Sequence, residues 1–144
     1  MRLLQDWQFG TALLVVPFLL ILLGQFLPTT TNIGWPLYSP DRFLILVVLY
    51  PLFEELAFRG WLQSMLYSYR FGYRQLAGIS LANIITSLIF AGLHFIYHPP
   101  IWATLVLIPS LLFGYFRDKY QSVKPAIILH IFYNSGYYWV FSAG

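Results

Sequence analysis

Apolar positions run along this chain in long stretches, each separated from the next by a short segment rich in proline, glycine or charge. A membrane-spanning helix needs about 20 mostly apolar residues. Stretches of this kind predict helices over residues 9–27, 40–69, 75–97, 101–116 and 125–141, some of them only marginally long. The pattern therefore predicts an all-α fold, a polytopic bundle of about five transmembrane helices.

The second of these helices has a clear start and an internal proline. Ser39, Pro40 and Asp41 form the start signal, because serine caps helices, proline suits the first helical position and an acid favours the positive end of the dipole. Pro51 has no N–H group to donate to the carbonyl of Val47, which predicts a kink at this point. We therefore expect one long helix that bends near its middle.

Composition supports a membrane location. Of the 144 residues, 59% are hydrophobic and only 9% are charged, whereas about 25% are charged in ordinary soluble domains. No repeat or linker divides the chain, so we expect a single transmembrane domain over residues 1–144. Within it, residues 1–38 should form an N-terminal anchor helix and loop, because no small-x-small cleavage motif follows the first apolar run.

The basic residues are single and scattered, which argues against nucleic acid as a partner despite the net charge of +3. They occupy every second connection, and therefore one side of the predicted bundle. Arg2 precedes the first helix, Arg70 and Arg74 follow the second, and Arg117, Lys119 and Lys124 follow the fourth. The positive-inside rule then places the N-terminus in the cytoplasm and the C-terminus outside. We expect an integral membrane protein of the bacterial plasma membrane, with the lipid bilayer as its first partner.

Three ionisable residues interrupt the second apolar run, in the sequence EELAFR from Glu54 to Arg59. Each such group costs about 2.5–3.5 kcal/mol at the bilayer centre, so each needs a partner or a function. On an ideal α-helix Glu55 and Arg59 form an i,i+4 pair, whereas Glu54 points about 140° away from Arg59. We expect Glu55 and Arg59 to be a structural pair and Glu54 to be left for chemistry.

Two later predicted helices carry polar residues at helical spacing. The sequence FAGLH places Phe90 and His94 on one face, and HIFYN places His130 and Asn134 on one face. Taken singly, each of these polar side chains is more often interhelical glue than a catalytic group. A surplus glutamate among several hydrogen-bond donors favours a chemical role for the set.

Several hydrolytic chemistries are missing from the sequence. There is no G-x-S-x-G serine elbow, and the absence of cysteine excludes a thiolate nucleophile. Asp6, Asp41 and Asp118 lie at predicted helix edges or in loops, which does not suit a pair of carboxylates sharing one proton. What remains is a glutamate that acts as general base on water.

A zinc site stays open as a minor alternative to a reaction without cofactor. No H-E-x-x-H motif is present, but His94 and His98 are spaced i,i+4 and could bind zinc together with His130 and Glu54. Without a metal, His94 would hold the water or protonate the leaving amine. His130 and Asn134 would then donate hydrogen bonds to the developing oxyanion.

The ordered motifs E-E-x-x-x-R, F-x-x-x-H and H-x-x-x-N, at residues 54–59, 90–94 and 130–134, resemble those of the CAAX protease and bacteriocin-processing (CPBP) membrane family, also called the abortive-infection family. The resemblance makes residues 39–144 a CAAX-protease-like core. It implies an intramembrane endopeptidase of the glutamate type that needs no metal and cleaves a peptide or a lipidated protein.

The resemblance also assigns roles by motif position. Glu54 would activate water with help from His94, while His130 and Asn134 would bind the oxyanion; the supporting residues would be Glu55, Arg59 and Phe90. A non-catalytic protein of the same family, acting in bacteriocin immunity or as a scaffold, is the alternative. Family members often have more helices before the first motif. A second subunit could therefore complete the wall of the active-site cavity, which makes an oligomer a further alternative.

Overall fold

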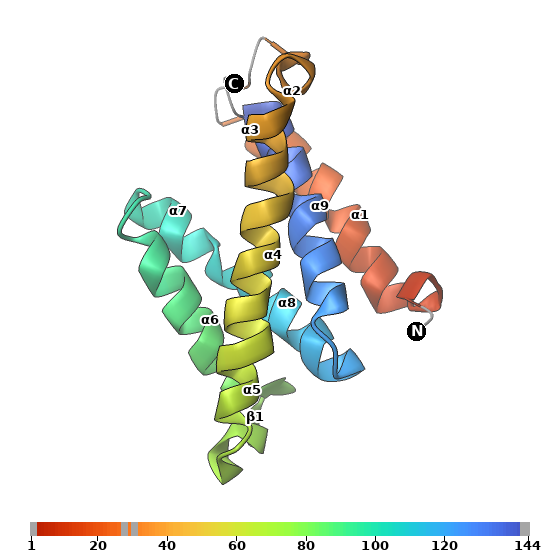
Figure 1. Ribbon diagram of the computed structural model, residues 1–144. Helices are drawn as coiled ribbons and strands as arrows, with labels where there is room; N and C mark the ends of the chain where they lie inside the picture. The colour runs from red at the N-terminus through yellow and green to blue at the C-terminus, as the bar shows by residue number, and fades with distance from the viewer. Residues whose placement is uncertain (1–2, 27–28, 30–31, 142–144) are drawn as a thin grey trace. The chain divides into compact units, whose positions relative to one another are not determined.

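The computed structural model describes residues 3–26, 29 and 32–141, so the positive charge predicted at Arg2 lies outside the described residues. Nearly all regular structure in it is helical, which confirms the all-α class (Figure 1). The chain divides into two compact units, Met1–Leu52 with Ile128–Gly144 and Phe53–Ile127. Each unit is defined by itself, and the single domain over residues 1–144 stays a prediction.

The first unit is built from the two ends of the chain. It contains η1 (Leu3–Gln5), α1 (Trp7–Leu23), α2 (Trp35–Tyr38), α3 (Pro40–Leu44), η2 (Ile45–Leu49), the start of α4 (Tyr50–Glu55) and most of α9 (Lys124–Phe141). The Tyr133 hydroxyl donates to the carbonyl of Ala12 at 3.1 Å, and the Trp35 indole donates to the carbonyl of Tyr138 at 3.2 Å. These bonds fasten α9 to α1 and to α2.

The second unit holds the middle of the chain. It contains the end of α4, η3 (Leu56–Leu62), α5 (Gln63–Leu66), η4 (Arg70–Tyr73), β1 (Gln75–Leu76), β2 (Ile79–Ser80), α6 (Leu81–His94), α7 (Pro100–Leu105) and α8 (Leu107–Tyr120). Helices α6 and α8 pack closely because Gly114 faces Asn83: a Cβ atom at Gly114 would collide with the Asn83 side chain. Small residues allow such close helix contacts in membranes.

The helix predicted from residue 75 begins later, at Leu81. Residues 75–80 instead form an antiparallel hairpin in which β1 pairs with β2, and its turn uses left-handed backbone at Ala77 (φ 51°) and Gly78 (φ 82°). Ser80 then caps α6, because its side chain accepts a hydrogen bond from the N–H of Asn83 at 3.0 Å. The sequence prediction was wrong here because a short apolar hairpin gives no periodic signal of its own.

The long second helix is present but is not a regular α-helix. Helical elements follow one another without a gap from Pro40 to Leu66, and two of them, η2 and η3, are π-helical. Ser39 occupies the capping position as predicted, although its side chain makes no cap hydrogen bond. π-helical turns are rare and often occur at functional sites.

The residues around Pro51 combine two helical registers. The N–H of Tyr50 donates to the carbonyl of Ile45, five residues earlier, whereas Pro51 itself lies in the α-helical segment α4. Pro51 has no N–H group to give to the preceding turn, and the kink expected there stays a prediction.

Among the described residues, one helix is long and apolar enough to cross a membrane, Pro100–Tyr120, which joins α7 and α8. Trp7–Leu23 and Leu81–His94 are apolar but shorter. The count of five spans therefore stays a prediction.

Candidate active site

The motif EELAFR lies on α4 and η3 of the second unit, and Arg59 is the centre of its contacts. The Arg59 Nε atom is 3.3 Å from Glu55 Oε2, and both side chains are 0% exposed. This is the ion pair that the sequence predicts. A buried carboxylate and guanidinium neutralise each other, so removing either one would leave an uncompensated charge in the interior.

Arg59 also connects η3 to both neighbouring helices. Its Nη2 atom donates to the carbonyl and to the hydroxyl of Ser110 on α8, each at 2.7 Å. Its guanidinium lies over the ring of Phe90 on α6, 4.9 Å from the ring centroid, which is within the range of a cation–π interaction. The Arg59 cluster, defined as Glu55, Arg59, Phe90 and Ser110, therefore ties three elements together.

Glu54 differs from its neighbour Glu55 in burial. Glu54 is half-buried, whereas Glu55 is completely buried. Both carboxylates act electrostatically on Arg59, with Glu55 the stronger of the two. The prediction that Glu54 points about 140° away from Arg59 assumed an ideal α-helix, whereas the π-helical segment η3 begins directly after Glu55. The direction of Glu54 stays a prediction.

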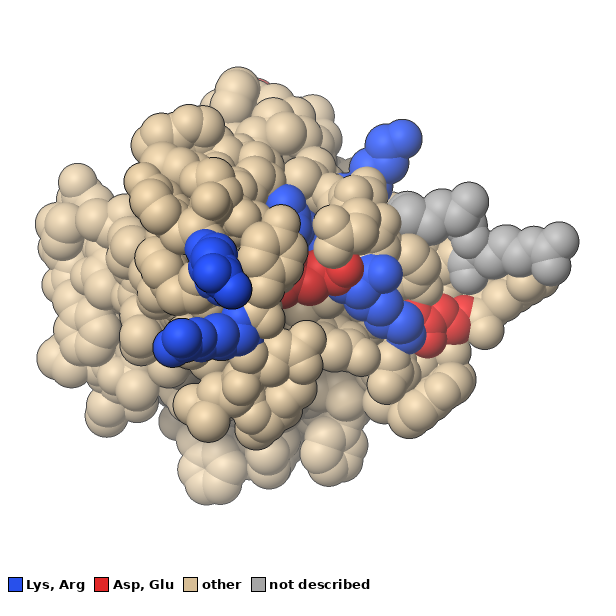
Figure 2. Space-filling model, turned by 90° about the horizontal axis from the view of Figure 1, so that it is seen from below, with Lys and Arg blue, Asp and Glu red and all other residues tan. Residues whose placement is uncertain are grey.

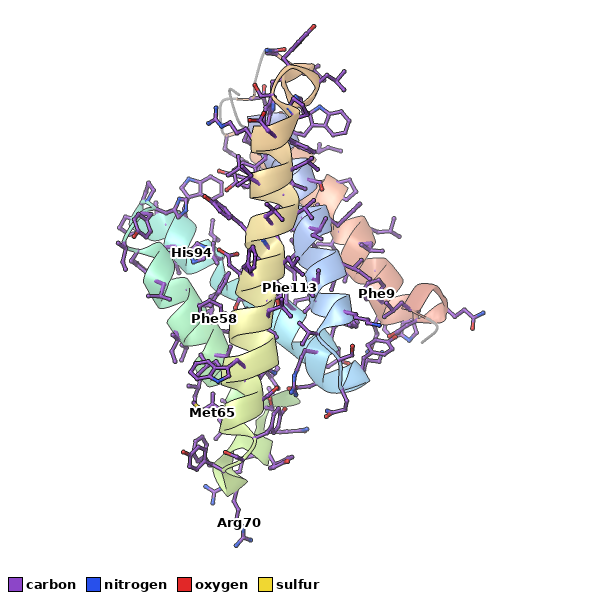
Figure 3. The ribbon with its side chains drawn as sticks, in the orientation of Figure 1. Phe9, Phe58, Met65, Arg70, His94 and Phe113 are labelled. Atoms are coloured by element: carbon purple, nitrogen blue, oxygen red, sulfur yellow. The ribbon has the colours of Figure 1, made fainter. Side chains whose placement is uncertain are left out.

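His94 ends α6 in the same unit (Figure 3). Its Nδ1 atom is 2.8 Å from the carbonyl oxygen of Phe90, and because a carbonyl only accepts, Nδ1 carries the hydrogen. In the neutral imidazole Nε2 is then the atom that accepts a proton or a hydrogen bond. The His94 ring also stacks on His98, with centroids 5.6 Å apart. A fixed tautomer is what a proton-handling histidine requires.

His130 and Asn134 lie on α9 in the first unit. His130 is 6% exposed. The Asn134 Nδ2 atom donates to the carbonyl of Leu46, a residue of η2, at 3.2 Å. The π-helical segment of the second helix thus provides the acceptor that orients the amide of the third motif.

Sequence reasoning missed the polar residues that line the packing of η3 and α5 against α8. Gln63 Nε2 donates to Asp118 Oδ1 at 2.8 Å and to the carbonyl of Gly114 at 3.3 Å. A signal was present, because Ser110, Gly114 and Asp118 recur every four residues, as do Arg59 and Gln63. Two matching stripes of polar and small residues are typical of facing helices.

Asp118 is the centre of a second polar group at the ends of these helices. Its carboxylate accepts hydrogen bonds from Ser80 at 2.6 Å and Arg117 at 3.1 Å, in addition to Gln63. Tyr67 follows the last residue of α5; burial, together with its hydrogen bond to Asp118, raises the pKa of its hydroxyl to about 12. The phenol therefore stays protonated at neutral pH.

In a comparison with protein families, residues 17–136 match the family described as Type II CAAX prenyl endopeptidase Rce1-like. No curated protein and no solved structure matches the chain. The matched region contains all three motifs and covers most of the chain, which confirms the family resemblance predicted from them. The chain belongs to the Rce1-like family of type II CAAX prenyl endopeptidases, a family of membrane-embedded proteases.

Proposed function

We propose that this protein is an intramembrane endopeptidase that hydrolyses a peptide bond of a membrane-associated substrate, with Glu54 as the general base. Membership of a protease family supports a peptidase role in general. The observation that carries the proposal is the difference between the two adjacent glutamates. Glu55 is sealed into an ion pair with Arg59, whereas Glu54 is half-buried, and a general base must reach water and substrate.

In the proposed reaction Glu54 takes a proton from water as the water oxygen attacks the carbonyl carbon of the scissile bond. The carbonyl electrons move to oxygen and form the oxyanion. When the C–N bond breaks, protonated Glu54 gives its proton to the leaving amine, either directly or through Nε2 of His94. The Nδ1–H bond of His94 to Phe90 supports such a relay, because it leaves Nε2 as the nitrogen that can accept the proton and pass it on.

His130 and Asn134 are proposed to donate hydrogen bonds to the oxyanion. The amide of Asn134 has two N–H bonds, of which one is given to the carbonyl of Leu46. The second can be donated to substrate, and the first holds the amide in one orientation.

The proposed substrate is a peptide or a lipidated protein held in the bilayer. The family description names a CAAX prenyl endopeptidase, and a lipid anchor would bring a polar cleavage site to the membrane surface. We propose no resident cofactor, with zinc as the alternative. We also propose that the protein lies in the bacterial plasma membrane, with its N-terminus in the cytoplasm and its C-terminus outside. An oligomer is the alternative to a monomer.

The proposal is tested by reconstituting the full chain in liposomes with farnesylated and unmodified peptides and analysing the products by mass spectrometry. General-base catalysis contributes roughly 100- to 10,000-fold, so Glu54→Gln should lose at least about 100-fold in kcat with unchanged thermal unfolding. Full cleavage by purified Glu54→Gln would refute the mechanism. Loss of activity to a chelator with recovery in zinc would favour the metal alternative instead.

A further inference from the structure

A cavity of about 420 Å³ lies in the second unit, away from the three motifs. None of the residues that line it belongs to those motifs. Its walls come from Tyr67 directly after α5, the end of η4, the hairpin of β1 and β2, the first turn of α6 and the last turns of α8. We call it the hairpin pocket. Its volume is in the range of about 300–1,000 Å³ that is usual for pockets that bind small molecules.

The side chains around the hairpin pocket are mainly hydrogen-bond donors. Among those that line it are Tyr73, Gln75, Tyr115, Arg117, Lys119 and Gln121. The one acid in the lining, Asp118, already accepts hydrogen bonds from Gln63, Ser80 and Arg117. Arg117 in turn gives its N–H groups to Asp118 and to Ser64. This pair is neutral as a whole, so Lys119 gives the lining its net positive charge.

The charge of this end of the second unit agrees with that lining. Between residues 60 and 127 there are five basic residues and one acid, namely Arg70, Arg74, Arg117, Lys119 and Lys124 against Asp118. Figure 2 shows blue Lys and Arg side chains beside red acidic ones on the face that is seen from below. Basic residues in the last turn of α8 also stabilise the helix dipole, but a dipole effect does not account for a cavity beside them.

The position of the hairpin pocket suits the headgroup layer of a membrane. It lies where α5 and α8 end, and three tyrosines, Tyr67, Tyr73 and Tyr115, line it. Tyrosine is enriched at the level of lipid headgroups. Basic pockets at the ends of membrane helices bind phosphate-containing headgroups. We propose that the hairpin pocket binds the phosphate group of an anionic lipid headgroup.

The first test compares two lipids that differ in the phosphate group. The detergent-purified full chain is titrated with phosphatidylglycerol or with diacylglycerol of the same acyl chains, and bound lipid is measured by native mass spectrometry. Phosphatidylglycerol should bind at least about tenfold more tightly, because charge-assisted hydrogen bonds to phosphate are strong. Equal binding of the two lipids would overturn the lipid assignment.

Two lysine variants distinguish specific binding in the hairpin pocket from non-specific attraction to a positively charged surface. Lys119 lines the pocket and Lys124 does not, yet both are exposed lysines at the same end of the unit. Lys119→Gln should weaken phosphatidylglycerol binding about tenfold, whereas Lys124→Gln should change it by less than about twofold. Equal losses, or no loss in Lys119→Gln, would show that the pocket does not hold the phosphate.

A competition experiment with inorganic phosphate shows whether the pocket recognises the phosphate group of a lipid or soluble phosphate. If millimolar phosphate displaces phosphatidylglycerol from the wild type, the phosphate group itself is recognised on the lipid. If phosphate binds in a manner that depends on Lys119 while the two lipids bind equally, the site takes soluble phosphate and the lipid assignment is wrong. The Glu54→Gln variant should bind like the wild type, which separates this site from the proposed catalytic one.

Discussion

Two arginines in the second unit make nearly the same set of contacts at different depths. Arg59 pairs with Glu55 at 3.3 Å, donates to Ser110 at 2.7 Å and lies 4.9 Å from the ring centroid of Phe90. The Arg59 and Glu55 side chains are both 0% exposed. All of these groups belong to the cluster that carries the first motif.

Arg117 repeats this arrangement at the ends of the helices. It pairs with Asp118 at 3.1 Å, donates to Ser64 at 2.6 Å and lies 5.1 Å from the ring centroid of Tyr67. Its side chain is 11% exposed and that of Asp118 is 19% exposed. The Arg117 cluster, defined as Ser64, Tyr67, Arg117 and Asp118, borders the hairpin pocket rather than the packed interior.

The difference shows how burial changes what the same set of side chains can do. Where water is excluded, an ion pair must stay intact, because a charge without its partner is strongly unfavourable. Where the groups are partly exposed, water screens their charges, so the loss of one partner costs less. We therefore expect the Arg59 cluster to hold the helices in place and the Arg117 cluster to take part in recognition.

The largest expected effect comes from removing the two arginines in turn. Arg59→Ala should lower the free energy of unfolding by about 3–5 kcal/mol, because Glu55 is left buried and unpaired. Arg117→Ala should lower it by about 1 kcal/mol, because Asp118 reaches water. Chemical denaturation in detergent micelles, followed by circular dichroism, measures both values.

A double variant checks the cause of that loss. In Glu55→Gln/Arg59→Met no unpaired charge remains, so stability should recover in part relative to Arg59→Met alone. Similar losses for Arg59→Ala and Arg117→Ala would remove the distinction between the two clusters.

Gly114 offers a second test, because it lies on α8 between Ser110 and Asp118, which belong to the two clusters. Gly114→Ala should lower the free energy of unfolding by about 1–3 kcal/mol, since the added Cβ collides with Asn83. Gly92→Ala on α6 is the matched control, with nothing within 4 Å of its Cβ position. The control should be neutral or stabilising by about 0.5–1 kcal/mol, and an equally mild Gly114→Ala would contradict the close packing of α6 and α8.

The smallest expected effect is the titration of Tyr67 in the Arg117 cluster. Burial and Asp118 raise its pKa from 10.0 to about 12, so its hydroxyl favours folding fully below pH 10 and loses that contribution as the pH rises to about 12. The difference in tyrosinate absorbance between wild type and Tyr67→Phe should show this midpoint. In Asp118→Asn the midpoint should move toward 10; an unchanged midpoint would mean that Asp118 is not a cause.

The helices and the family were predictable from the sequence, because long apolar runs and three ordered motifs are strong signals. The start of α6 could also have been found, since Ser80 is a capping residue just before the apolar run. The hairpin of residues 75–80 could not, because its turn places Ala77 in a left-handed conformation that few non-glycine residues adopt.

The π-helical turns were out of reach for a different reason. A π-turn changes the hydrogen-bond register of one segment but leaves the run of apolar residues around it unchanged. The direction of Glu54 relative to Arg59 depends on that register. The ion pair of Glu55 with Arg59 was predictable because i,i+4 spacing within one helix is enough to bring the groups together.

The central claim is that two adjacent glutamates have separate tasks, and one paired measurement tests it directly. Cleavage rate and free energy of unfolding are measured for Glu54→Gln and Glu55→Gln in the same detergent. We expect Glu54→Gln to fold like the wild type and to cleave at least about 100-fold more slowly, and Glu55→Gln to be clearly destabilised because Arg59 loses its partner. A stable, inactive Glu55→Gln together with an active Glu54→Gln would contradict the assignment.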